Sequence, residues 1–487
     1  MEDDSLQQLE RALLHQQQSV IRRPSVPQSP VLVWPGSPVR ASWSAGQSGR
    51  PGSPSRACLL SSPLLRPSPL LRRPHSCQLE DNFSLDEEGP LTVVQAIFNL
   101  ANIIVGAGVL SIPYAFKQSG YFTIVIILVV IFITDLTGKW IGSALRLAGN
   151  TKGAEAIPQS ARDFAFLAET AFGSRGRRFI TFVTVLEVWF ACVTLLTMNG
   201  NNAKTIWPSL APAVSVPITG ALATVSSLIP ETTFAYLSLA SSLSLLLAVV
   251  AMIAATCMLS EWAEPYARLD SDALIHVRNI PQSVGIVMFC FAGHPCFPAI
   301  YGSMRETKRW DFAVDATFLV AFLFYATVGF VGYVVFGAGL DETVTRNLAG
   351  IPGELALWCQ DIAALGFLVK VQLTVPLMLN ALMVACWPPA LGQPEWPPRR
   401  LLLLALLGTA TSFVAVALRD SVAVVAGFTG SFCVMMTSVL FPAAAHLALS
   451  CSGGSRRPAC LTYAGVICFG CVMAVLGTAS AAWDLLA

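Results

Sequence analysis

Three ionisable side chains stand inside long apolar stretches of this 487-residue chain. Glu187 lies within TFVTVLEVWFACVTLL, His294 within FCFAGHPCF, and Lys370 within LGFLVKVQLTVPLMLN. A charge near the middle of a membrane span costs about 2.5–3.5 kcal/mol on insertion scales, so such residues are candidates for ion and proton pathways. A buried carboxyl group favours its protonated form and an imidazole titrates near neutral pH, and both properties suit proton transfer. These three are the candidate ion-coupling residues.

Each of the three residues also has a purely structural explanation. Glu187 could pair with a group on a neighbouring helix, and His294 could donate hydrogen bonds to carbonyls that a helix kink leaves free. Lys370 could run its apolar stem along the helix and place its amine at one membrane face. The sequence alone leaves both interpretations of each residue open.

The composition indicates the class of protein that holds these residues. Hydrophobic residues make up 54% of the chain and charged residues only 12%, with a mean hydropathy of +0.63. A soluble domain carries about 25% charged residues, so the chain is predicted to be a multi-pass membrane protein in contact with lipid. The net charge is +1 and no separate basic region is present, which argues against a nucleic-acid partner.

Motifs for enzymatic chemistry or for a bound metal are not found. Most of the thirteen cysteines lie inside apolar stretches, and no Cys/His spacing fits a zinc site. The chain has no nucleotide-binding loop and no Ser-His-Asp or HExxH arrangement on a plausible frame. We therefore expect no enzyme, no metal and no cofactor. A channel is an alternative class, but it would need a repeated pore-lining loop or a symmetric oligomer.

Eleven apolar segments follow Pro90, and a helix needs about 20 residues to cross the hydrocarbon. We expect an all-α membrane domain with spans near residues 91–116, 121–147, 177–199, 211–229, 234–260, 281–302, 313–337, 354–384, 400–418, 420–449 and 459–485. The fourth is the weakest, because it is short and rich in Ser, Thr and Pro. Residues 161–175 are too polar to span and are predicted to form an amphipathic helix at the membrane interface.

The distribution of Lys and Arg predicts the orientation. With the N-terminus in the cytosol, the loops inside the cell carry twelve basic residues and the loops on the other side carry six. Residues 1–89 add nine arginines on the inside. Cytosolic loops are enriched in Lys and Arg, so a cytosolic N-terminus is expected.

The first span contains residues that break helices. Gly106, Gly108 and Pro113 lie in the middle of VVQAIFNLANIIVGAGVLSIPYAF, which begins at Val93. Glycine costs a helix about 1 kcal/mol and proline about 3, and unpaired backbone groups are tolerated in a membrane only against protein or a watery cavity. The break therefore predicts a substrate site near the middle of the membrane, as in transporters with discontinuous helices.

The sixth span is interrupted in the same way, with Gly293, His294, Pro295 and Pro298 at its centre. Two broken spans five apart fit a five-plus-five inverted repeat, in which both breaks line one cavity. Helix N-termini would supply N–H groups to a carboxylate there, and free carbonyls would receive an ammonium group. The candidate substrate-binding residues are Asn102, Val105, Gly106, Ala107, Gly108, Phe291, Ala292 and Gly293. Two proline kinks that serve packing only are the alternative.

Three motifs in these segments are shared with a known family. The stretch from Asn99 to Tyr114 holds GAG and SIPY, and FCFAGH is followed by Phe297-Pro298 and Tyr301. The third motif, GFTGS, is followed by Phe441-Pro442 and His446. From about residue 90 to the C-terminus the chain resembles the amino acid/auxin permease family. The resemblance is to the vacuolar amino acid transporters of plants and fungi and to the vesicular inhibitory amino acid transporter.

That resemblance implies a leucine-transporter-like core with discontinuous first and sixth helices, plus an eleventh helix. It also implies secondary active transport of amino acids by alternating access, coupled to protons, in a vacuolar or other internal membrane. Small residues such as Ala107, Ala292 and Gly293 leave room for many neutral amino acids. The alternative among carriers is a sodium-coupled amino acid transporter of the plasma membrane.

The resemblance also gives the ionisable residues specific roles. Family members carry a carboxylate at the place of Glu187, and the related branch carries a lysine at the place of Lys370. In sodium-coupled members of this fold class the first and eighth spans hold a sodium ion. We expect the ammonium group of Lys370 to replace that ion by donating to backbone carbonyls near Gly106. Only some family members have Gly-His at the place of His294, so transport need not depend on it.

Residues 1–89 form a separate region rich in Pro, Ser, Arg and Gln. Such a composition cannot bury enough apolar area to fold, so a disordered cytosolic tail is predicted, followed by a transporter domain at 90–487. Ser-Pro pairs begin at Ser29, Ser37, Ser53, Ser62 and Ser68, and kinases that recognise Ser-Pro are possible partners of the tail. Chance occurrence in a Pro/Ser-rich tail is the alternative.

Overall fold

The computed structural model describes residues 89–151, 157, 159, 162–229, 231–257, 274–348, 353–386, 397–452 and 460–486. The predicted tail and its Ser-Pro pairs lie outside these residues, apart from Gly89. In the described ranges the backbone forms helices and turns without any strand, and one isolated bridge pairs Leu91 with Met304. The prediction of an all-α fold is confirmed.

The helices follow the predicted apolar segments closely. Up to residue 303 they are α2 (Val93–Ile104), η1 (Ala107–Ser111), α3 (Ile112–Ser119), η2 (Gly120–Phe122), α4 (Thr123–Gly149), α5 (Phe164–Ile206), α6 (Pro212–Ser226), α7 (Glu231–Cys257), η6 (Val277–Asn279), α9 (Ile280–Cys290), η7 (His294–Cys296) and α10 (Phe297–Ser303). Beyond it they are η8 (Thr307–Arg309), α11 (Trp310–Phe336), η9 (Gly337–Gly339), α12 (Val344–Leu348), α13 (Glu354–Cys386), α14 (Pro398–Ala417), α15 (Val422–Phe428), the π-helix η10 (Thr429–Leu440), α16 (Phe441–Ser452) and α17 (Cys460–Leu486).

The number of membrane crossings differs from the simple count of eleven. Among the described residues, nine helical segments are long and apolar enough to cross a membrane. Two further apolar helices, Val93–Ile104 and Pro212–Ser226, are shorter than a full crossing. They coincide with the first half of the predicted first span and with the weak fourth span. Each predicted span therefore has a helix, but eleven crossings are not confirmed.

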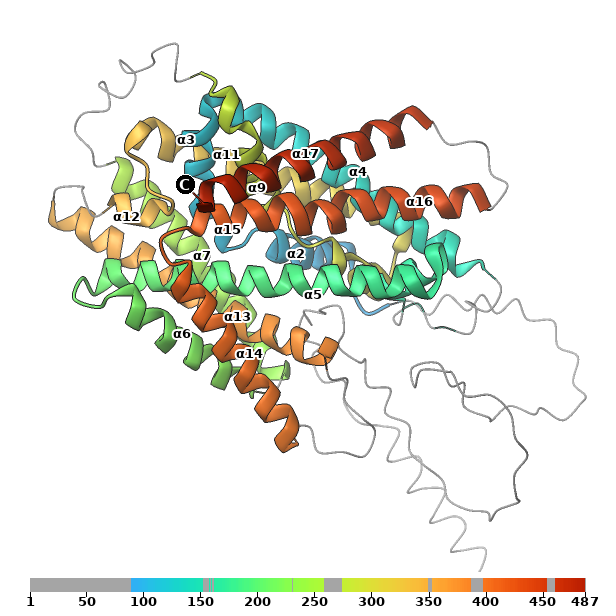
Figure 1. The fold of residues 1–487 in the computed structure, drawn as a ribbon, viewed down its shortest axis with the longest axis horizontal. Helices are drawn as coiled ribbons and strands as arrows, with labels where there is room; N and C mark the ends of the chain where they lie inside the picture. The colour runs from blue at the N-terminus through green and yellow to red at the C-terminus, as the bar shows by residue number, and fades with distance from the viewer. Residues whose placement is uncertain are drawn as a thin grey trace, which may run out of the picture. The chain divides into compact units, whose positions relative to one another are not determined.

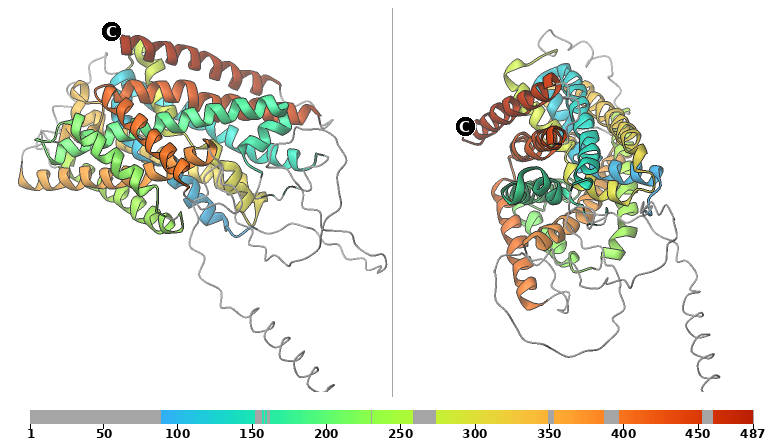
Figure 2. Two further views of the ribbon diagram at one scale, coloured as in Figure 1. Left: turned by 60° about the horizontal axis from the view of Figure 1, so that its bottom comes forward. Right: turned by 90° about the vertical axis from the view of Figure 1, so that its right-hand side faces the viewer.

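The broken spans are enclosed by longer helices. α11 packs against α2, α3 and α4, while α9 packs against α3, α15 and η10. α13 packs against α7 and α5, and α5 also contacts α16, beside which it runs in Figure 1. α17 lies at the edge of the helices in both views of Figure 2. This arrangement places the two interruptions inside the packed helices.

Large apolar side chains cover much of the outer surface of the helices. Phe132 of α4 is 68% exposed, Phe413 of α14 is 75% exposed and Leu461 of α17 is 85% exposed. A soluble protein rarely exposes such extensive apolar patches. A surface of this kind fits contact with lipid, as expected for a multi-pass membrane protein.

α5 is bent near its start. The Asp163 carboxylate accepts a hydrogen bond of 2.7 Å from the Phe166 N–H and so caps the helix. Gly173 then has φ 71° and ψ −168°, which interrupts the helical backbone. The helical segment before Gly173 overlaps the amphipathic helix predicted at 161–175.

A carboxylate ties the segment after α11 to the start of α15. Glu342 accepts a hydrogen bond of 2.8 Å from the backbone N–H of Val422. Burial raises the pKa of Glu342, and its backbone hydrogen bonds and nearby Arg346 oppose that shift without cancelling it. Glu342 lies outside the predicted spans and is a titratable group that anchors the start of α15.

Candidate functional site

The first span is broken where its glycines predict. α2 ends at Ile104, and the backbone is extended at Gly106, with φ −116° and ψ −168°. A Cβ atom added to Gly106 would meet no atom within 4 Å, so this position borders open space. Pro113 lies in the first turn of α3, where its missing N–H has no helical partner to lose.

The sixth span is broken at a glycine as well. α9 ends at Cys290, and the chain turns at Gly293 with φ 155° before η7 and α10. A Cβ atom at Gly293 would lie 2.7 Å from Cγ2 of Ile103, so both the backbone angle and the space require glycine. Both predicted interruptions are therefore present.

The two breaks lie against each other. The Cys290 thiol donates a hydrogen bond of 3.2 Å to the carbonyl oxygen of Gly108. A Cβ atom at Gly108 would lie 3.0 Å from the same sulfur atom, so glycine permits this close approach. With Gly293 close to Ile103 in the last turn of α2, the two broken spans approach each other at two places.

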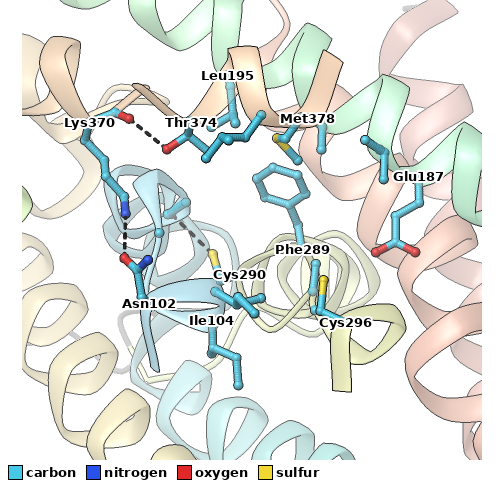
Figure 3. A pocket seen from close by; sticks show the side chains of 18 of the residues that line it. Asn102, Ile104, Glu187, Leu195, Phe289, Cys290, Cys296, Lys370, Thr374 and Met378 are labelled. Carbon is cyan, nitrogen blue, oxygen red and sulfur yellow. Dashed lines mark hydrogen bonds between the residues drawn. The ribbon is translucent and has the colours of Figure 1, made fainter. Parts of the chain in front are cut away.

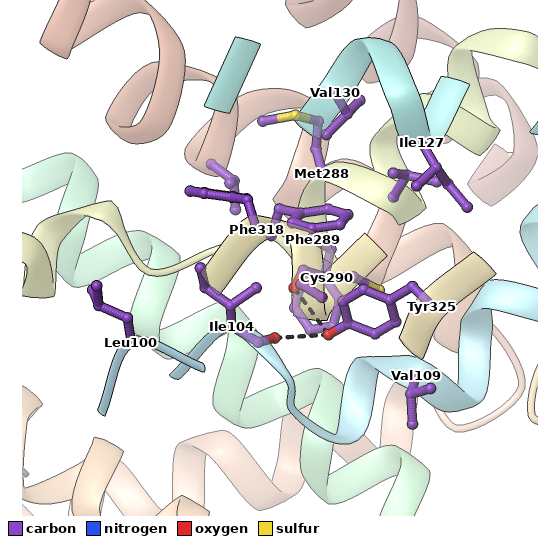
Figure 4. Close-up of a cluster of buried hydrophobic side chains, with 14 of the residues drawn as sticks. Leu100, Ile104, Val109, Ile127, Val130, Met288, Phe289, Cys290, Phe318 and Tyr325 are labelled. Carbon is purple, nitrogen blue, oxygen red and sulfur yellow. Dashed lines mark hydrogen bonds between the residues drawn. The ribbon is translucent and has the colours of Figure 1, made fainter. Parts of the chain in front are cut away.

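One tyrosine hydroxyl contacts both breaks. Tyr325 of α11 is fully buried, and its Oη lies 2.7 Å from the carbonyl oxygen of Ile104 and 3.1 Å from that of Cys290. The N–H of Gly106 donates to the same Oη at 3.4 Å. Figure 4 shows the ring of Tyr325 beside Cys290 with its hydroxyl directed at Ile104.

A cavity of about 140 Å³ opens at this junction. Besides the two breaks, α5 and α13 supply its wall, with single contributions from α7 and α11. A cavity of about 150 Å³ can hold benzene, so the space suits a small organic molecule. The lining residues include Asn102, Ile104, Gly106, Gly108, Glu187, Val188, Ala191, Leu195, Ser241, Phe289, Cys290, Ala292, Gly293, Cys296, Tyr325, Lys370, Leu373, Thr374, Leu377 and Met378.

Lys370 marks one end of the cavity. Its Nζ donates a hydrogen bond of 3.2 Å to Oδ1 of Asn102, and Oγ of Ser242 donates to the same oxygen at 2.6 Å. Among the described residues Lys370 forms no salt bridge. The expected contact with backbone carbonyls near Gly106 is replaced by this contact with an amide side chain in the last turn of α2.

Glu187 marks the opposite end. Its Oε2 accepts a hydrogen bond of 2.6 Å from Oγ1 of Thr437 in η10. In the part of the chain that the structure describes, it too forms no salt bridge. Figure 3 shows Lys370 and Glu187 on opposite sides of the cavity, with Phe289 and Met378 between them. The cavity can therefore present hydrogen-bonding groups at its ends and an apolar wall between them.

His294 lies outside the cavity lining. Its Nε2 is 3.0 Å from the carbonyl oxygen of Thr134 and 3.3 Å from Oγ1 of Thr137, both in α4. Its ring stacks on Phe297 with centroids 4.5 Å apart. Because a carbonyl only accepts, Nε2 carries the proton in this contact, and His294 links η7 to α4.

The predicted site residues divide into two groups. Seven of them line the cavity: Asn102, Gly106, Gly108, Glu187, Ala292, Gly293 and Lys370. Val105, Phe291 and His294 are not among the lining residues, and the side chain of Ala107 lies outside the described set. Their roles in binding stay predictions. Among the described residues, no group of three His, Cys, Asp or Glu side chains could hold a metal ion.

Sequence reasoning missed Tyr325 and the apolar wall from α5 and α13. A hydroxyl-bearing aromatic ring inside an apolar span is a signal that could have drawn attention to Tyr325, although Tyr333 of the same span carries the same signal. Leu195, Leu373 and Met378 carry no comparable signal, since every span is rich in such residues.

Comparisons with known proteins agree with this geometry. The family described as transmembrane amino acid transporter protein matches residues 89–482. The chain is 27% identical over 409 residues to amino acid transporter AVT1D of Arabidopsis thaliana, covering 82% of this chain and 70% of that protein. It is 23% identical over 412 residues to the vesicular GABA transporter of Caenorhabditis elegans, covering 82% and 80%. The structure of MhsT in complex with L-phenylalanine aligns with a TM-score of 0.53 and 13% identity, over 79% of this chain and 98% of MhsT.

Proposed function

Because the chain belongs to the transmembrane amino acid transporter family, we propose that it carries neutral amino acids across an internal membrane, with protons as the coupling ion. The expected family is confirmed, and so is the leucine-transporter-like fold. Its relatives are transporters and not enzymes, which agrees with the prediction that the chain is not an enzyme. The substrate class, coupling ion and membrane are the proposed parts.

The observation that supports the proposal is that two interrupted spans meet at one cavity. The breaks place backbone N–H and C=O groups without helical partners beside the cavity, where they suit the carboxylate and ammonium groups of a zwitterion. The wall between the ends is apolar, with Phe289, Leu373 and Met378 among its residues. A neutral side chain fits that wall better than a charged one, because a charge would lose its hydration there.

The residues at the two ends of the cavity favour protons over sodium as the coupling ion. Lys370 already places an ammonium group between α13 and α2, the two elements in which the fold class of the chain would hold sodium. Glu187 has a neutral hydrogen-bond partner rather than a cationic one, so it can gain and lose a proton without breaking an ion pair. A sodium-coupled transporter of the plasma membrane is the second candidate.

The location and orientation rest on sequence and relatives. One relative is named a vesicular transporter, and the excess of Lys and Arg in alternate loops favours a cytosolic N-terminus. In this proposal residues 1–89 form a cytosolic tail, open to kinases at its Ser-Pro pairs, and residues 90–487 form the transporter.

The test is uptake of labelled neutral amino acids by the purified full-length chain in proteoliposomes, with imposed proton or sodium gradients. We expect saturable uptake that an inward proton gradient accelerates and a sodium gradient does not. Uptake that follows sodium alone would establish the second candidate instead. Uptake without saturation would indicate a channel.

A cavity-filling variant ties that uptake to the described site. Gly106→Leu places a side chain where a Cβ atom meets nothing within 4 Å, in an extended backbone that any residue adopts, so the chain should fold with its cavity blocked. Gly465→Leu on α17 is the matched control, because its Cβ also meets nothing within 4 Å but lies away from the cavity. We expect uptake to be lost in Gly106→Leu and retained in Gly465→Leu.

A further inference from the structure

The hydroxyl of Tyr325 is the one group that touches the backbone of both interruptions at once, among the described side chains that line the cavity. It lies within hydrogen-bond distance of the Ile104 and Cys290 carbonyl oxygens, and it accepts from the Gly106 N–H. Ile104 is the last residue of α2 and Cys290 is the last residue of α9. Carbonyls in the last turn of a helix have no partner in that helix, so both oxygens depend on donors from elsewhere.

The Tyr325 hydroxyl has fewer protons to donate than there are carbonyl oxygens within reach of it. A phenol has one O–H to donate, and two carbonyl oxygens, one from each broken span, compete for it. The distance of 2.7 Å to Ile104 and of 3.1 Å to Cys290 places the proton on the Ile104 side in this structure. The carbonyl oxygen of Cys290 therefore receives the weaker hydrogen bond from the Tyr325 hydroxyl.

α11 places the ring of Tyr325 between the two breaks. The ring of Tyr325 packs edge-on against Phe291 at 5.2 Å and against Phe324 at 6.1 Å. α11 is a continuous helix over Trp310–Phe336. A movement of either break relative to α11 therefore changes the distance between its carbonyl oxygen and the Tyr325 hydroxyl.

We propose that Tyr325 is a positioning residue that couples the two broken spans, by passing its single hydrogen bond from the Ile104 carbonyl to the Cys290 carbonyl as the transporter changes state. This inference rests on the proposed transport function. When the phenol bonds to one break, the carbonyl of the other break needs a different donor, and the ammonium group of a bound amino acid supplies one in the same cavity. Binding of substrate and the choice of the bonded break are then linked.

The test compares Tyr325→Phe with Tyr333→Phe in the full-length protein. The first change removes the shared hydroxyl and keeps the ring. The second removes a hydroxyl from the same helix, at a ring that packs against Phe116 and Tyr121. We expect the maximal uptake rate of L-alanine to fall about tenfold in Tyr325→Phe, with KM changed less than about threefold, since one hydrogen bond is lost and the cavity wall is not. Tyr333→Phe should match the wild type.

Amide hydrogen exchange measures the coupling directly and without a ligand. In Tyr325→Phe, peptides that cover residues 100–112 and 286–296 should both exchange about tenfold faster, whereas Tyr333→Phe should leave both unchanged. Faster exchange in only one peptide, or in neither, would overturn the coupling. This readout does not depend on uptake, so it separates a failure of the coupling from a failure of the wild type to transport any amino acid.

A second variant covers the case in which Tyr325→Phe does not fold. Incorporation of 3-fluorotyrosine at position 325 keeps the ring and the hydroxyl and makes the phenol a stronger donor. Exchange in both peptides should then slow about twofold, because the hydrogen bond that the breaks share is strengthened. An unchanged rate in either peptide would contradict the proposal.

Discussion

The two ends of the cavity hold opposite charges in different ways. Lys370 is 4% exposed. Its hydrogen bond to Asn102 joins α13 to α2, and the hydrogen bond from Ser242 to the same Asn102 oxygen joins α7 to both. Glu187 is 5% exposed and has one neutral partner, Thr437 of the π-helix. The cationic end cross-links three helices, whereas the anionic end is held by a single hydroxyl.

This difference separates a fixed charge from an exchangeable one. Ser242 holds the Asn102 amide so that its oxygen faces Lys370, which keeps an acceptor directed at the ammonium group. Thr437 has a second acceptor, since its Oγ1 also lies 3.2 Å from the carbonyl oxygen of Cys433. If Glu187 becomes protonated, Oγ1 of Thr437 can donate to the Cys433 carbonyl and accept from the new carboxyl O–H, so neither buried donor is left unpaired.

The largest effect is expected at the fixed end. Lys370→Ala removes a buried hydrogen-bonded charge, worth about 1.5–3 kcal/mol, so proton-driven uptake should fall about 10- to 100-fold. The vacated space faces Asn102, and sodium should restore part of the uptake. Uptake in proteoliposomes with each gradient measures both effects.

The control for that change is a lysine outside the cavity. Lys139→Met removes the cation that Asp135 of α4 and Asp315 of α11 share away from the cavity, and should leave uptake near the wild-type rate. Unchanged proton-driven uptake in Lys370→Ala would remove the distinction between the two ends.

The next effect is expected at the exchangeable end. Glu187→Gln keeps an acceptor for Thr437 but cannot lose or gain a proton. Net uptake driven by a pH gradient should fall about tenfold, while exchange of labelled for unlabelled amino acid should continue, because exchange needs no net proton movement. Counterflow assays at several pH values check this.

Glu169→Gln is the matched control on the same helix, since Glu169 pairs with Arg177 away from the cavity, at 2.6 Å. An equal loss of net uptake and exchange in Glu187→Gln would show that Glu187 supports the structure rather than carrying a proton.

His294 sharpens the comparison because it lies near the breaks but off the cavity. His294→Gln retains an N–H that can donate to the Thr134 carbonyl, so uptake should stay within about twofold of the wild type with the same pH profile. A flatter pH profile of uptake in this variant would indicate that the proton pathway runs through His294 in the second break and not through Glu187.

The smallest effect is expected at a carboxyl group outside the spans. Burial raises the pKa of Glu342 above its ordinary value of 4.5, against the opposing effects of the Val422 and Ala423 backbone groups and Arg346, and with the help of Asp420. The folded protein therefore holds this proton more tightly than the unfolded chain, so the stability contributed by Glu342 is present at acid pH and is lost as the pH rises through the raised pKa.

Glu342→Gln should flatten that part of the pH dependence by about 1 °C in melting temperature between pH 4 and pH 8 and leave uptake unchanged. Melting curves of the purified variant and the wild type at several pH values measure it. A change in the coupling of uptake to protons would show that pH sensing is not confined to the cavity.

Local features of the sequence predicted the spans and their interruptions. Long apolar runs require helices, and Gly106 and Gly293 fall where helices cannot continue, so both breaks were predictable from residue type and position. Glu187 and Lys370 were recognisable because an ionisable group is costly in an apolar stretch.

Contacts between distant segments were not predictable in the same way. Tyr325 is separated by 221 residues from Ile104, and Thr437 by 250 residues from Glu187, so no local pattern records either pair. Lys370 was expected to meet backbone carbonyls, but the spacing of a single helix does not specify which side chain of a neighbouring helix it will reach. The number of crossings also differs from the prediction, because α2 and α6 are shorter than a helix that crosses the hydrocarbon.

The π-helix that carries Thr437 has a consequence for insertions and deletions. A π-helix bonds each N–H one residue further back than an α-helix does, so η10 stores chain length between α15, anchored by Glu342 at Val422, and α16, whose Phe441 packs edge-on against Phe164 at 4.6 Å. A deletion of one residue between Thr429 and Thr437 can be absorbed by rewinding toward α-helical geometry, with both anchored ends in place. The rewound segment would turn Thr437 away from α5 and remove its hydrogen bond to Glu187. The register of η10 would thereby affect the protonation of Glu187.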